Sequence, residues 1–286
     1  MIKEAYKKQV QLLLSSLPEI AKETCFALHG GTAINLFVRD MPRLSVDIDL
    51  TFLPIQNREI SHIQINEALD RIKNNLEFLQ ANIKVHHLKK EAKLLVSNQI
   101  ANIKVEVNLT KRGCFAPPQL LDLNLVAQEI FDSFCAIQVV EKGHLYGGKM
   151  CAALDRQHPR DLFDIMFMLD NEVFTYEMKK GFIFYLISGE RPIREILFPH
   201  LSDQSQVFKN QFKGMADEDF SYEDYEQVRF RLLRLVKDSL TSEDIKFILS
   251  IKKGEPEWSI YNFKDFPAVQ WKLRNINSLK TDNPKK

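Results

Sequence analysis

The sequence predicts an α+β fold, with a small mixed β-sheet and flanking helices in the first half and a helical domain in the second. Two observations support this prediction. Segments in which apolar and polar residues alternate, as in half-buried strands, lie before residue 143 of the 286-residue chain. Beyond Gly143 the apolar residues recur at helical spacing. We therefore expect an α/β core at residues 1–142 and a helical domain at residues 143–286.

The first half contains two segments with particularly clear patterns. A short apolar run ends at Gly30-Gly31 and is followed by helical spacing, which indicates a strand, a glycine turn and a helix. Residues 46–54 alternate between an apolar and a polar face, as a strand does. The other elements expected there are helices at 3–17 and 57–80, and strands at 83–88, 92–97, 100–110 and 136–140.

The second half is expected to be helical throughout. Thr241 and Ser242 carry hydroxyls that suit a helix N-cap, and Asp244 lies where a first turn would follow. Because Pro18 and the polar tail from Ser278 disfavour helix, we expect the first helix to stop at Pro18 and the tail to be frayed. The five helices expected in this half lie at 144–156, 160–170, 174–187, 221–239 and 242–252.

Composition and charge exclude several classes of protein. With 45% hydrophobic and 27% charged residues, global disorder is excluded. The net charge of +1 gives no general attraction to nucleic acid. No apolar run approaches the roughly 20 residues of a membrane helix, and no signal-like segment precedes the first charged residues. The four cysteines are scattered without a CxxC pair, so we expect neither zinc nor disulfides, but a reducing cytoplasm.

Asp47 and Asp49 are the first candidate site residues. They lie two residues apart on the strand 46–54, so both carboxylates point to the face opposite its apolar residues. Two carboxylates this close repel each other unless a cation lies between them, and Mg²⁺ prefers such oxygen ligands. The alternative is an exposed strand face with two solvated acids, which the D-x-D spacing alone does not exclude.

Gly30, Gly31 and Thr32 form a second candidate site just upstream. Glycine lets a phosphate approach the backbone, the following helix offers unpaired N–H donors, and Thr32 adds a hydroxyl. A turn that simply requires glycine is the alternative. A phosphate cradle and an acid pair in consecutive elements are, however, the two halves of a nucleoside-triphosphate site.

Glu106 is the third candidate acid, on the polar face of the strand 100–110. If this strand lies beside 46–54, Glu106 can join Asp47 and Asp49. Two metal ions need about three carboxylates, and the third can also activate a hydroxyl nucleophile. A solvated face is an equal alternative, because the neighbours of Glu106 on that face are also polar.

The segment from Gly30 to Leu50 resembles the motif of the nucleotidyltransferase superfamily in its AbiEii/AbiGii toxin branch. That pattern is a strand, G-G-[TS]-A, a helix and R-x-S-x-D-[IL]-D-L. The general superfamily prefers Gly-Ser at the turn, so Thr32 would replace the missing hydroxyl here. The resemblance implies a nucleotidyltransferase-like sheet with Ser45 among the nucleotide-binding residues. The chain reads Gly30-Gly31-Thr32-Ala33 and then Arg43-Leu44-Ser45-Val46-Asp47-Ile48-Asp49-Leu50.

A second block, in residues 147–169, supports the resemblance. Family members carry a helix with Lys, Ala-Leu and Arg, followed by Arg-Asp-Leu-x-Asp on the next helix. We expect Lys149, after a flexible Gly147-Gly148, to reach the triphosphate and Asp161 to orient the acceptor or nucleotide, so that 143–170 contributes to the active site. The alternative is an interhelical salt-bridge cluster, which we favour for the other charged members. The block comprises Lys149, Ala153-Leu154, Arg156 and Arg160-Asp161-Leu162-Phe163-Asp164.

The resemblance implies a toxin of a toxin–antitoxin or abortive-infection pair. Related toxins transfer a nucleotide from a nucleoside triphosphate to an RNA acceptor, the 3′ end of tRNA, and so block translation. The resemblance also implies two Mg²⁺ ions, held by Asp47, Asp49 and Glu106, and an antitoxin as partner. Two alternatives are a nucleotidyltransferase that modifies an antibiotic and a non-catalytic nucleotide- or partner-binding module; the intact Asp47/Asp49 pair argues against the second.

An RNA acceptor would have to be held by local basic residues, because the net charge is only +1. The expected helix 221–239 is the best candidate for such a cluster. The alternative is that its basic residues pair with acids of the same helix. The basic residues are Arg229, Arg231, Arg234 and Lys237.

Overall fold

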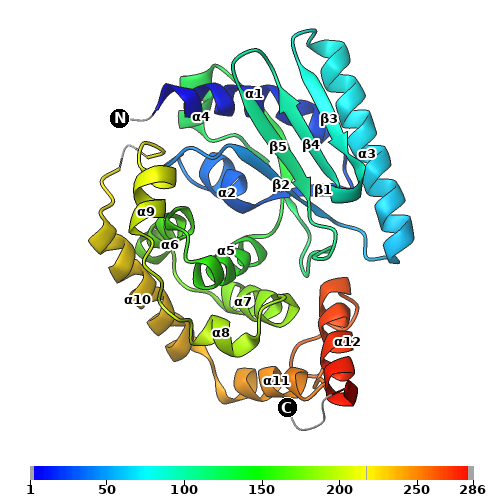
Figure 1. The fold of residues 1–286 in the computed structure, drawn as a ribbon, viewed down its shortest axis with the longest axis vertical. Helices are drawn as coiled ribbons and strands as arrows, with labels where there is room; N and C mark the ends of the chain where they lie inside the picture. The colour runs from blue at the N-terminus through cyan, green and yellow to red at the C-terminus, as the bar shows by residue number, and fades with distance from the viewer. Residues whose placement is uncertain (1–2, 217, 283–286) are drawn as a thin grey trace. The chain divides into compact units, whose positions relative to one another are not determined.

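The computed structural model describes residues 3–216 and 218–282 and divides into two compact units (Figure 1). The first unit comprises the chain up to Glu141 together with residues 212–219. The second comprises residues 142–211 and the chain from Phe220 onward. Among the described residues, no helix is both long enough and apolar enough to cross a membrane.

A seven-stranded mixed sheet forms the centre of the first unit, in the order β3-β4-β5-β2-β1-β7-β6. β2 pairs antiparallel with β1 and parallel with β5, so the strands that carry the candidate acids are neighbours. The predicted α+β class with a mixed sheet is confirmed. The strands are β1 (Phe26–His29), β2 (Asp47–Phe52), β3 (Lys84–Leu88), β4 (Lys93–Ser97), β5 (Asn102–Val107), β6 (Gln119–Asp122) and β7 (Ala136–Val139).

Two long helices, α1 (Glu4–Ala21) and α3 (Arg58–Leu79), contact each other and the sheet. Their buried apolar side chains form the core with those of β2 and β5. The expected stop at Pro18 is wrong: α1 continues to Ala21 because Ile20, only 1% exposed, packs into this core. The unit also contains two shorter helices, α2 (Gly30–Ala33), which continues as a π-helix at Ile34–Val38, and α4 (Leu125–Phe131).

The second unit is helical. The five expected helices correspond to α5, α6, α7, α10 and α11 within a few residues. The unexpected α12 includes the tail that we expected to be frayed as far as Asp282, and residues 283–286 of that tail lie outside the described residues. The helices are α5 (Lys142–Arg156), α6 (Pro159–Asn171), α7 (Tyr176–Ser188), α8 (Ile193–Leu197), α9 (Ser205–Val207), α10 (Tyr222–Ser239), α11 (Ser242–Lys252) and α12 (Pro267–Asp282).

Helices α5 and α7 pack backbone to backbone through glycine. A Cβ placed on Gly147 would overlap the main chain of Gly181, and a Cβ on Gly181 would overlap the carbonyl of Gly143. The expectation of a flexible Gly147-Gly148 before the helix is therefore wrong, because both glycines lie inside α5 and are buried. Glycine is needed here for close approach of two helices and not for flexibility.

Candidate functional site

The start of α2, which follows β1 directly, lies against one of the candidate carboxylates. Gly30 has a φ of +73°, a left-handed backbone that favours glycine. A Cβ at this position would also overlap Oδ2 of Asp49. Glycine is thus required at residue 30 both for its backbone conformation and for the approach of the Asp49 carboxylate.

The Thr32 side chain connects the start of α2 to the start of β2 by hydrogen bonds. Its hydroxyl donates to the main-chain carbonyl oxygen of Asp47 at 2.5 Å and lies 3.0 Å from the Ser45 hydroxyl, with which it shares a hydrogen bond. Thr32 is fully buried and Ser45 is 7% exposed. The two hydroxyls therefore orient the segment that leads into the candidate carboxylates.

Arg43 is a site residue whose position the sequence did not predict. It is 3% exposed, and a Cβ on Gly31 would lie 2.7 Å from its Nη2, so its guanidinium covers the glycine turn. A distant segment holds this loop in place: the Leu44 amide donates to the Met215 carbonyl at 2.8 Å, and Arg43 forms a β-bridge with Ala216. The R-x-S-x-D motif signalled that Arg43 matters, but not that residues 212–219 would hold it.

The candidate carboxylates lie on the polar face of β2. Asp47 and Asp49 are half-buried, and they alternate with the buried Ile48 and Leu50. The predicted alternation is therefore present. In the sheet register Asp49 lies opposite Glu106 on β5, so the expected neighbourhood of these two strands is observed.

Glu106 has a cationic partner in the structure. Its carboxylate forms an ion pair with Nζ of Lys93 on β4 at 2.8 Å. Within residues 3–216 and 218–282, no three His, Cys, Asp or Glu side chains are grouped so that they could hold a metal ion. The Asp47/Asp49 pair has the oxygen donors that a hard cation prefers. A role of Glu106 as a third metal ligand stays a prediction, and in that role its carboxylate would be shared between Lys93 and the metal or would exchange one for the other.

Lys149 and Asp161 lie together in the second unit, in a buried ion-pair cluster. The Lys149 ammonium is 2.9 Å from Asp161 Oδ1 and 2.9 Å from Asp164 Oδ2. Arg156 adds a second cation, with Nε at 2.5 Å from Asp161 Oδ2. Burial raises the pKa of Asp161, but Lys149 and Arg156 outweigh this effect and lower it below its ordinary value.

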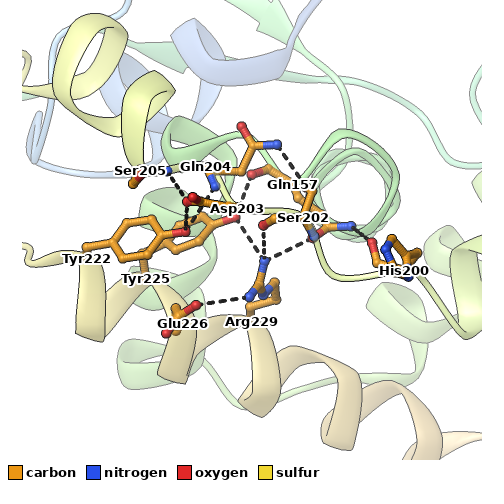
Figure 2. Close-up of polar contacts among 10 residues, drawn as sticks. All are labelled: Gln157, His200, Ser202, Asp203, Gln204, Ser205, Tyr222, Tyr225, Glu226 and Arg229. Carbon is orange, nitrogen blue, oxygen red and sulfur yellow. Dashed lines mark hydrogen bonds and ion pairs between the residues drawn. The ribbon is translucent and has the colours of Figure 1, made fainter.

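Gln157 fixes the junction between α5 and α6, and therefore the cluster on either side of it (Figure 2). Its backbone is left-handed, with a φ of +50°. Its side-chain amide donates to the His200 carbonyl at 2.8 Å, and its main-chain carbonyl accepts from the Tyr225 hydroxyl at 2.9 Å. Arg229 donates to Gln157 Oε1 at 3.0 Å and to the Ser202 carbonyl at 2.9 Å. No sequence pattern indicated this role for Gln157.

This network changes the interpretation of the basic residues on α10. Arg229 is 4% exposed and belongs to the interior of the second unit, so it is not part of a basic surface. Arg231 pairs with Asp170 on α6 at 2.6 Å, and Arg234 lies 3.5 Å from Asp238 on its own helix. Three of the four basic residues therefore have structural partners.

Comparison with known proteins agrees with the fold and the motifs. No curated protein matches the sequence. Among solved structures, the chain is similar to MenT4, a nucleotidyltransferase toxin from Mycobacterium tuberculosis, with a TM-score of 0.66 and 13% identity over 96% of this chain and 95% of that one. Residues 11–275 match the family described as the nucleotidyl transferase AbiEii toxin of type IV toxin–antitoxin systems. The chain therefore belongs to the AbiEii family of nucleotidyltransferase toxins.

Proposed function

We propose that this toxin transfers a nucleotide from a nucleoside triphosphate to the 3′ hydroxyl of tRNA and so blocks translation. The acceptor oxygen attacks the α-phosphorus, the bond to the β-phosphate breaks, and pyrophosphate leaves. The observation that carries the proposal is the Asp47/Asp49 pair beside the Gly30 turn. Such a pair, half-buried on the polar face of a strand, suits a divalent metal and a polyphosphate.

Asp47 and Asp49 are the residues proposed to hold Mg²⁺, with Glu106 as the third ligand of a two-ion site. When bound, the metal polarises the acceptor hydroxyl and neutralises charge on the leaving pyrophosphate. Because Gly30 has no Cβ, the space beside the Asp49 carboxylate stays free for the metal or a phosphate. Glu106 is also the residue proposed to accept the hydroxyl proton, since carboxylates serve as general bases.

The remaining residues of the turn are proposed to position the triphosphate. Gly31 offers its backbone to phosphate oxygens, and the Arg43 guanidinium that covers it supplies a charge. Thr32 and Ser45 act through their hydrogen bonds to each other and to the Asp47 carbonyl, which orient the acid-bearing strand. This is a positioning role, because both hydroxyls are buried.

Lys149 and Asp161 are proposed to serve the reaction from residues 143–170. The Lys149 ammonium is shared by Asp161 and Asp164, so contact with a triphosphate uses its third N–H or exchanges one carboxylate for a phosphate oxygen. Asp161, once released, could accept a hydrogen bond from a ribose hydroxyl. An antitoxin is proposed as the protein partner, and the cytoplasm, where tRNA is found, as the place of action.

Transfer of radiolabelled nucleotide to total tRNA, with each of the four triphosphates in turn, tests the proposal. We expect incorporation in the presence of Mg²⁺ and its loss in Asp47→Asn and Asp49→Asn. Removal of one carboxylate leaves the metal under-coordinated while the side-chain volume stays the same. Growth arrest on induction should disappear in the same variants.

Asp122→Asn is the matched control, because Asp122 is an exposed carboxylate of β6 in the same sheet. It should label tRNA as the unmodified protein does. Near-normal labelling by Asp47→Asn would show that the assigned site is wrong. Labelling of a small molecule or a protein in place of tRNA would keep the site and refute the acceptor.

A further inference from the structure

A cluster of basic side chains lies at the other end of β2 from Asp47. The Gly113 amide donates to the Phe52 carbonyl at 2.8 Å, which brings the loop after β5 to the end of β2. From this loop Arg112 reaches α3, where its Nη1 donates to the carbonyl of Asn57, the N-cap residue, at 3.3 Å. Six strand residues at about 3.3 Å each place this point roughly 15–20 Å from Asp47.

The basic side chains at this point, Arg58, His62 and Arg112, form no ion pair with any of the residues that the structure describes. Arg112 is 4% exposed and its Nε has no hydrogen-bond partner. Among the described residues, the charge that acts on its pKa is the positive charge of Arg58 and not a carboxylate. The Nε2 of His62 is buried and likewise lacks a partner. Arg58 lies four residues before His62, on the same face of α3. Glu59, the acid of the first turn, is exposed and forms no ion pair with these residues.

Local electrostatics agree with this geometry. Burial lowers the pKa of His62, and the positive charges of Arg58 and Arg112 lower it further. Burial also lowers the pKa of Arg112, with Arg58 as the second cause. An arginine that is buried without an anion is costly, because its charge loses hydration and gains no partner. The arrangement is therefore that of a site made to receive an anion.

We propose that Arg58, His62 and Arg112, together with the N-terminus of α3, bind a phosphate group at a site separate from the Asp47/Asp49 pair. α3 is 22 residues long, so its dipole favours a negative charge at this end, and the Asn57 side chain takes up only the Ile60 amide of the first turn. A guanidinium fork matches two phosphate oxygens, and a histidine near a phosphate becomes protonated and adds a third donor. The phosphate comes either from the free ion or from an RNA backbone, and the site does not depend on the proposed transfer reaction.

The imidazole of His62 provides the readout. Its pKa is measured by NMR in the full-length protein, with and without inorganic phosphate at constant ionic strength, and its signal is assigned from the His62→Gln variant. Bound phosphate should raise the pKa of His62 by about one unit, because an anion replaces an uncompensated positive environment. An unchanged pKa at saturating phosphate overturns the proposal.

Arg58→Gln is the principal variant, because Arg58 is exposed and its loss should not affect folding. It should weaken phosphate binding by about tenfold, through the loss of one charge-assisted contact. Arg112→Gln should weaken binding at least as much, provided that its unfolding transition stays cooperative. Lys84→Gln is the matched control: Lys84 is exposed on β3, beyond the far end of α3. Equal weakening by Lys84→Gln and Arg58→Gln would reduce the effect to general surface charge and overturn the proposal.

A short RNA with a 5′ hydroxyl and a 3′-deoxy end, which has only backbone phosphates and no 3′ hydroxyl for extension, distinguishes the two sources of phosphate. If this RNA raises the pKa of His62 and Arg58→Gln suppresses the effect, the ligand is a backbone phosphate. If only inorganic phosphate does so, the ligand is the free ion. If neither raises it, the site does not bind phosphate and the inference is wrong.

Discussion

Gly30 is the single residue on which the surroundings of the carboxylate pair depend most directly. Gly30→Ala adds a methyl group that overlaps Oδ2 of Asp49, on a backbone with φ +73°. We expect a loss of about 1–3 kcal/mol in the free energy of unfolding and a larger loss of nucleotide transfer, because Asp49 must move. Urea unfolding and the tRNA labelling assay measure the two effects.

Gly31→Ala is the matched control for this prediction. Its Cβ would meet only the ends of side chains, 2.7 Å from Arg43 Nη2 and 3.0 Å from Ser45 Oγ, which can shift. It should therefore cost less stability than Gly30→Ala. Equal costs in the two variants would contradict the importance that we give to the Gly30–Asp49 contact.

Asp161 makes the stability of the second unit sensitive to acid. Its pKa in the folded state is lowered, because Lys149 and Arg156 outweigh the effect of burial. A lowered pKa stabilises the fold above the unfolded value of about 3.9, and this contribution is lost as the pH falls through the folded value. We expect the free energy of unfolding to fall steadily below about pH 4.

Asp161→Asn separates this contribution from that of other carboxylates. The variant should be less stable than the unmodified chain at pH 7, since Lys149 then keeps the Asp164 carboxylate but loses that of Asp161. Between about pH 5 and pH 2, however, it should lose less stability than the unmodified chain. Parallel pH profiles for the two proteins would show that Asp161 does not carry the lowered pKa.

At the level of elements, the crossing of α5 and α7 is the most sequence-sensitive contact of the second unit. Gly147→Ala and Gly181→Ala each place a methyl group into main-chain atoms of the other helix. Backbone cannot give way as a side chain can, so we expect a loss of about 3 kcal/mol or more in the free energy of unfolding. Gly189→Ala, whose Cβ would lie 3.2 Å from the Tyr185 carbonyl oxygen, is the control and should cost much less. Thermal unfolding of the three variants checks the order.

The elements that the sequence did not predict are short or sparsely buried. β6 has no buried residue and α4 buries only Ala127, so neither presents the apolar periodicity from which elements are recognised. Asn124 nevertheless caps α4, with its side chain accepting from the Ala127 amide at 2.8 Å. An N-cap signal was therefore present at that position. α12 was missed because its apolar side chains are concentrated in its first turns and its end is polar and exposed.

For the whole molecule, the net charge of +1 means that RNA binding must depend on local cations. Arg231 and Arg234 have carboxylate partners, but exposed ion pairs are worth little and can exchange for phosphate. Replacement of Arg231, Arg234 and Lys237 together by Ala should therefore flatten the salt dependence of RNA binding by up to about three units of slope. Titration of labelled tRNA at several salt concentrations measures the slope.

A matched triple variant, with Lys84, Lys252 and Lys253 replaced by Ala, removes the same formal charge from exposed positions elsewhere. It should leave the slope unchanged. If the α10 variant keeps the slope of the unmodified protein, RNA is held elsewhere, and the phosphate site at Arg58 is the first place to look.

The sequence by itself determined the features that depend on neighbouring residues. The period of a strand places Asp47 and Asp49 on one face. The two glycines after a short strand mark the point where the chain leaves β1 and enters α2. The order of the motifs was enough to indicate the family, which the match over residues 11–275 confirms. The chemical roles of the residues in these motifs remain proposals.

Only the tertiary structure decided which groups meet. The register of β2 on β5 sets Glu106 opposite Asp49, while β4 supplies Lys93 as its ion-pair partner. Met215 and Ala216 hold the loop that carries Arg43, although some 170 residues of chain lie between them. Lys149 lies between two carboxylates of α6 and not at an exposed helix start. Backbone periodicity is local and can be read from the sequence, whereas the partner of a charged side chain depends on which distant segment packs against it.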